Sequence, residues 1–162
     1  MSDVTRHARI SDDGLYRYML AHVWDLNTPP ICWIMLNPST ADAKQDDATI
    51  RTVTWWTRKF GAGGFVVVNL FALRSTDPKG LFAAADPVGP DNAGWIQRAV
   101  ELCPRILCAW GASPKPEGGL LPALQILWYA QGKKIYCLGK TKDGHPRHPL
   151  YVKRNTVPEP FL

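Results

Sequence analysis

The chain has 162 residues, of which 46% are hydrophobic and 20% are charged, and its net charge is +5. This composition excludes a disordered or fibrous protein, and its apolar runs are too short to span a bilayer. We therefore expect a single domain over residues 1–162, with its core at about residues 15–155. Because the first residues lack the apolar core of a signal peptide, we expect the protein to be cytoplasmic.

Apolar and capping patterns predict an α/β domain in which strands and helices alternate. The first segment, Tyr16 to Trp24, alternates enough to form an additional antiparallel strand at one edge of the sheet. The main strands are expected at Cys32 to Leu36, Phe65 to Asn69, Arg105 to Trp110 and Lys134 to Leu138. The helices are expected at Asp47 to Phe60, Asp91 to Leu102 and Leu120 to Gln131. This order predicts a three-layer sandwich with a four-stranded parallel central sheet.

A polar residue or a glycine stands at the end of each expected main strand. Asn37 follows the first strand, Asn69 ends the second, and Gly111 and Gly139 follow the third and fourth. Open parallel sheets bind ligands beyond the carboxyl ends of their strands, so we expect a binding site at this edge. An asparagine amide there can hold a water molecule or read a nucleobase. Alternatively, Asn37 shapes a turn and Asn69 ties down a loop.

The positive charge is concentrated near the C-terminus. Residues 133–154 hold seven bases and one acid, a net charge of +6 against +5 for the whole chain. This concentration is typical of a phosphate-bearing partner, or else of a basic edge that aids solubility. The same window contains a proline-framed loop with His145, Arg147, His148 and Tyr151. A histidine in such a loop can donate a hydrogen bond or a proton near neutral pH.

The sequence predicts no resident metal or cofactor. The cysteines form no C-x-x-C pair, so we expect buried, reduced thiols at Cys32, Cys103, Cys108 and Cys137. Three acids, Asp42, Asp46 and Asp47, follow the Asn37 turn. One of them is expected to cap the next helix, although together they could hold a hard cation.

Several sequence motifs resemble those of DUF1643, a family of proteins from bacteria and phages. The resemblance covers about residues 15–155. These motifs are Met35-Leu36-Asn37-Pro38-Ser39-Thr40-Ala41-Asp42, Asp47-x-Thr49-Ile50-Arg51, Val68-Asn69-Leu70-Phe71-Ala72-Leu73-Arg74-x-Thr76-x-Pro78, Ala109-Trp110-Gly111 and Pro146-Arg147-His148-Pro149-Leu150-Tyr151. The same skeleton more distantly resembles the uracil-DNA glycosylase superfamily. Its mismatch-specific branch has a G-I-N-P-G motif that corresponds to residues 35–39, and an H-P-S-P-L motif that His148-Pro149-Leu150 approximates. Met35 and Ser39 stand where that branch has glycines.

The glycosylase resemblance implies hydrolysis of the N-glycosidic bond of a base flipped out of nucleic acid. We expect this nucleic acid to be DNA rather than RNA. Asn37 would then position the attacking water, and His148 would stabilise the departing base. Asn69 would read the base, on which Phe71 or a nearby tryptophan would stack. The resemblance further implies phosphate contacts from Lys140, Lys142 and Arg147, and a wedge into the base stack formed by Leu150 or Tyr151.

Two other functions remain open from the sequence. One is a non-catalytic module that binds nucleic acid or a modified base. The other is a metal-dependent enzyme that acts on free nucleotides, with Asp42 and Asp47 as ligands. We expect no membrane partner in any of these cases.

Overall fold

The computed structural model describes residues 3–39, 44–112, 129–130 and 132–161. Within them a mixed sheet of seven strands has the order β1-β2-β4-β3-β5-β6-β7. The strands are β1 (Thr5–Ile10), β2 (Arg17–Val23), β3 (Ile31–Met35), β4 (Gly64–Asn69), β5 (Arg105–Cys108), β6 (Lys134–Cys137) and β7 (Glu159–Pro160). β3 pairs in parallel with β4 and β5, and β5 pairs in parallel with β6. The pairs β1–β2, β2–β4 and β6–β7 are antiparallel.

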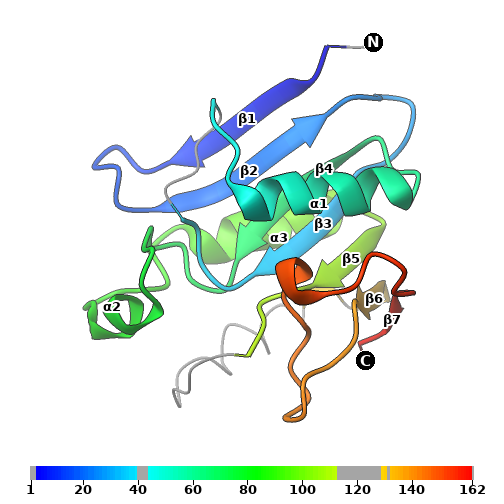
Figure 1. The fold of residues 1–162 in the computed structure, drawn as a ribbon. Helices are drawn as coiled ribbons and strands as arrows, with labels where there is room; N and C mark the ends of the chain where they lie inside the picture. The colour runs from blue at the N-terminus through cyan, green and yellow to red at the C-terminus, as the bar shows by residue number, and fades with distance from the viewer. Residues whose placement is uncertain (1–2, 40–43, 113–128, 131, 162) are drawn as a thin grey trace.

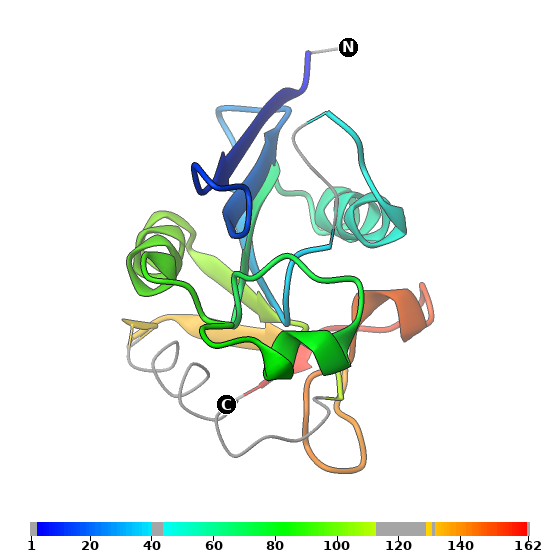
Figure 2. The same cartoon turned by 90° about the vertical axis from the view of Figure 1, so that its left-hand side faces the viewer.

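Helices cover both faces of this sheet. These are α1 (Ala48–Lys59) and α3 (Asn92–Leu102); the described residues also form the short helix α2 (Pro78–Ala83) and the 3-10 helix η1 (Pro149–Tyr151). α1 packs Trp56 onto the face that carries Trp33, whereas α3 packs Ile96 onto the face that carries Cys32. Figure 1 shows the sheet with α1 in front, and Figure 2 shows α1 and α3 on opposite sides of the strands. β3 and β4 are buried along their whole length, as expected for strands covered on both faces.

The local sequence of α1 determines where this helix starts and ends. The side chain of Asp47 accepts the Ile50 N–H at 2.8 Å, which satisfies one of the donors that a helix N-terminus leaves unpaired. Apolar residues recur on the buried face of α1, and Arg58 and Lys59 stand in its last turn, where cations are favourable. Gly61 then takes a φ of +67°, a left-handed conformation that ends the helix.

The α/β class is confirmed, but the sheet has seven strands, whereas four parallel strands and one additional antiparallel strand were expected. The segment from Tyr16 to Trp24 contains β2, which is antiparallel as predicted but does not form an edge, because β1 lies outside it. β1 escaped prediction because its sequence, TRHARI, is polar and its side chains are mostly exposed. The helix expected at Leu120 to Gln131 lies almost entirely outside the described residues. Among the described helices, none has the length and hydropathy needed to cross a membrane.

Candidate functional site

A pocket of about 320 Å³ lies at the carboxyl ends of the parallel strands. The chain passes from β3 to β4 on one side of β3, whereas β5 lies on its other side and leads onward to β6. The connections that leave β3 and β5 therefore lead toward opposite edges of the sheet. Open α/β sheets leave a crevice between two such neighbouring strands. The pocket is lined by residues that follow β3 and β5, by the end of β4, by the start of α1 and by η1, together with the buried Arg17 of β2 and Thr76.

Asn37 enters this pocket directly after β3. Its side-chain nitrogen donates to the carbonyl of Ser75 at 2.8 Å and to that of Pro38 at 3.2 Å. The Ser75 N–H in turn donates to the Pro38 carbonyl, so the two loops hold each other. Because both amide hydrogens are engaged, the side-chain oxygen of Asn37 is the atom of this amide that is left to accept a hydrogen bond.

Asn69 reaches the same pocket from the last position of β4. Its side chain is only 2% exposed, and its amide nitrogen has no hydrogen-bond partner among the described residues. A buried donor without a partner destabilises the folded chain by about 1–3 kcal/mol. A ligand with a suitable acceptor would remove this penalty.

A second buried asparagine, Asn92, holds the backbone at Asn69. The Asn92 side chain, at the start of α3, donates to the carbonyls of Asn69 at 2.9 Å and of Leu70 at 3.2 Å. It thereby fixes the turn that follows β4. Sequence reasoning missed this role, since an asparagine in the first turn of a helix carries no signal that it faces a neighbouring strand.

His148 lies across the pocket, where it caps η1. The Leu150 N–H donates to His148 Nδ1 at 3.2 Å, so the proton of the neutral imidazole is on Nε2. Burial lowers the pKa of His148, and the nearby Asp47 carboxylate opposes this shift only in part. His148 is therefore neutral at pH 7 and is a hydrogen-bond donor through Nε2.

Gly111 allows the loop that carries His148 to approach the end of β5. The Gly111 N–H donates to the Pro146 carbonyl at 2.8 Å, and Gly111 has a φ of +78°. A Cβ atom at this position would lie 3.3 Å from the Cβ of His148. A glycine after Trp110 therefore permits both the left-handed turn and the close contact.

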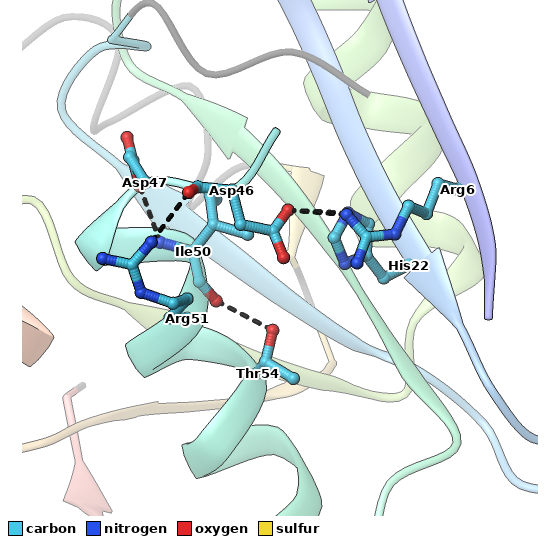
Figure 3. Close-up of polar contacts among 7 residues, drawn as sticks. All are labelled: Arg6, His22, Asp46, Asp47, Ile50, Arg51 and Thr54. Atoms are coloured by element: carbon cyan, nitrogen blue, oxygen red, sulfur yellow. Dashed lines mark hydrogen bonds and ion pairs between the residues drawn. The ribbon is translucent and has the colours of Figure 1, made fainter. Parts of the chain in front are cut away.

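The acids that follow Asn37 have separate roles. Asp47 caps α1 and also accepts a hydrogen bond from the Ser39 hydroxyl, and both residues line the pocket. Asp46 instead lies 3.0 Å from Arg6 Nη1 and 3.5 Å from His22 Nε2. Figure 3 shows the Asp46 carboxylate directed toward Arg6 and His22, and the Asp47 carboxylate directed away from them. Asp42 lies outside the described residues, and among those described no group of three or more histidines, cysteines or acids is arranged to hold a metal ion.

Phe71, expected to stack on a base, lies in the core. It is buried, its ring meets that of Phe82 edge-on at 5.3 Å, and it is not among the described residues that line the pocket. The aromatic residues Trp110 and Tyr151 line the pocket: Tyr151 is exposed, whereas Trp110 is 7% exposed and meets the Phe161 ring edge-on at 5.3 Å. The structure therefore does not bring Phe71 to the pocket.

The expected phosphate and wedge residues lie around the pocket. Leu150 and Tyr151 line it, and Tyr151 is 81% exposed. The three bases expected to bind phosphate are exposed and are not among its described lining: Lys140, Lys142 and Arg147. Arg147 Nε donates to the Lys140 carbonyl at 3.2 Å, which joins the two sides of this loop.

The fold and the pocket together define an α/β protein with a pocket at the carboxyl edge of its parallel strands. The sequence matches the family described as "Protein of unknown function (DUF1643)" over residues 17–150. Because this match covers most of the chain, the protein belongs to that family, as the sequence motifs indicate. Neither the curated proteins nor the solved structures contain a match to the chain.

Proposed function

We propose that the protein recognises a nucleobase and hydrolyses its N-glycosidic bond, in the manner of a uracil-DNA glycosylase. The observation that carries the proposal is the buried, unpartnered amide nitrogen of Asn69, in the pocket that also holds Asn37 and His148. An asparagine amide can pair through its nitrogen and oxygen with the edge of a base. The pocket thus combines a group that can read a base with groups that can act on its bond to the sugar.

The three polar side chains support distinct steps. A nucleotide flipped out of the helix enters the pocket, where Asn69 reads its edge and Trp110 stacks on its face. The side-chain oxygen of Asn37 accepts a hydrogen bond from water and directs that water toward the anomeric carbon. As the C–N bond breaks, negative charge develops on the departing base, and the neutral His148 donates to it from Nε2. A donor already in place for this charge stabilises the transition state more than the ground state.

The surroundings of the pocket support a polymeric substrate. The exposed bases Lys140, Lys142 and Arg147 belong to the segment that connects β6 to η1, close to the His148 end of the pocket. Cations there would hold phosphates, while the exposed Tyr151 would occupy the space left by the flipped base.

The proposal is tested with a panel of oligonucleotides that carry damaged or modified bases, followed by hot alkali to cleave abasic sites. We expect strand cleavage on at least one member, and its loss in His148→Gln. The matched control is His145→Gln, because His145 is in the same loop but is not among the described pocket residues. Binding of the panel without any base release would refute catalysis and support the binding module. Equal cleavage by both histidine variants would refute the role of His148.

A further inference from the structure

The pocket contains a carboxylate that the proposed function does not yet use. Asp47 lines the pocket together with Asn37 and His148. One of its oxygens accepts the Ile50 N–H at 2.8 Å, and the other accepts the Ser39 hydroxyl. Figure 3 shows Asp47 at the start of α1, next to the Ile50 backbone that it caps. Each carboxylate oxygen has two lone pairs, so both oxygens can accept a further hydrogen bond.

Helix capping alone does not require a charge at this position. Asparagine and serine cap helices about as well as aspartate, because the cap needs only a side-chain oxygen. The charge of Asp47 does reach the pocket, since it raises the pKa of His148 against the larger effect of burial. The carboxylate therefore lies in the pocket in which we expect the water and the base to bind.

His148 cannot take a proton from the attacking water. Its Nδ1 accepts the Leu150 N–H, and its Nε2 already carries the proton that it donates to the base. Asn37 has no basic atom. Among the described residues that line the pocket, Asp47 is the one carboxylate, and so it is the group suited to accept a proton.

We propose that Asp47 is the general base of the reaction, an inference that rests on the proposed function. A water molecule held by Asn37 gives one proton to a carboxylate oxygen of Asp47. The water oxygen forms a bond to the anomeric carbon as the bond to the base nitrogen breaks. The electron pair of that broken bond leaves with the base, which His148 stabilises. The proton on Asp47 then passes through solvent to the base, so the products are the free base and the sugar hydroxyl.

Asp47→Asn separates this role from capping, because asparagine still offers an oxygen to the Ile50 N–H but is not basic. The matched control is Asp77→Asn. Asp77 caps α2 by accepting the Lys79 N–H at 2.9 Å and is not among the described pocket residues. We would measure the single-turnover rate against pH, the Kd for the cleaved oligonucleotide and the Tm of each variant.

We expect Asp47→Asn to lower the single-turnover rate by about 10²–10⁴-fold, the usual contribution of a general base. The dependence of the rate on pH should differ between the wild-type protein and the variant. Kd and Tm should change no more than in Asp77→Asn. An Asp47→Asn variant within threefold of the wild-type rate, with an unchanged pH profile, overturns the inference alone. A wild-type protein that releases no base from any oligonucleotide overturns the proposed function and this step together.

Discussion

Replacing Asn69 by leucine should make the protein more stable while abolishing its activity. Leucine has a similar branched shape, and it removes a buried donor that has no partner among the described residues. Relief of such a donor should raise the free energy of unfolding by about 1–3 kcal/mol. For a chain of this size, each kcal/mol should raise Tm by roughly 2–4 °C. The pocket beside Asn69 leaves room for the larger side chain.

Asn92→Leu provides the matched control, because this asparagine is also buried but donates to two carbonyls. Its replacement takes the donor from both carbonyls and also removes a side-chain oxygen that has no partner among the described residues. The net change should be a decrease of about 1–3 kcal/mol in the free energy of unfolding. Urea titration and thermal melts of both variants measure the two changes, and the oligonucleotide panel measures activity. If Asn69→Leu loses as much stability as Asn92→Leu, the Asn69 amide serves the fold, and our reasoning about the pocket is wrong.

Three further predictions concern the reaction, the polymer and pH. Asn37→Ala should lower the rate of base release and leave Kd for the oligonucleotide nearly unchanged, because its contact with water matters in the transition state; single-turnover kinetics and binding assays separate the two. The log of DNA affinity should fall less steeply with the log of salt concentration in a triple alanine variant of Lys140, Lys142 and Arg147, and an equal slope would exclude these bases from the interface. Burial lowers the pKa of both His22 and His148, so the unfolded state binds protons more strongly. The free energy of unfolding should therefore decrease as pH falls below about 6.5, and urea titrations should show a smaller decrease in a variant with both histidines changed to glutamine.

Elements with a strong local signal could be predicted from the sequence. α1 has a capping aspartate, apolar residues on one face and a terminating glycine, and its observed bounds fall within one residue of those expected. β4 is a nearly continuous apolar run, as expected for a strand covered on both faces. β1 and β7 carry no such signal, because one is polar and exposed and the other has only two residues. Their places depend on pairing with β2 and β6, which a local pattern does not contain.

The candidate site could be predicted where it follows from topology. Asn37 and Asn69 were expected at the carboxyl edge, and His148 was expected at the site from the glycosylase resemblance. The structure brings all three to one pocket. The direction of individual side chains could not be predicted. Phe71 follows Asn69 by two residues, yet it packs against Phe82, because the chain has already left the strand and turned. The contact of Asn92 with the end of β4 joins segments more than 20 residues apart, so it depends on how α3 packs.

Two buried polar groups in neighbouring strands differ in how their hydrogen bonds are satisfied. Trp33 in β3 donates its indole N–H to the Thr57 hydroxyl at 3.0 Å, and Thr57 donates onward to the Val53 carbonyl. That chain of hydrogen bonds satisfies a polar atom deep in the interface between α1 and the sheet. Asn69 in β4 follows three buried valines, where another apolar residue would fit the strand and would need no partner. An asparagine at the pocket end of that strand lowers stability unless its amide gains a partner, and Asn69 lines the pocket in which we propose that a base binds.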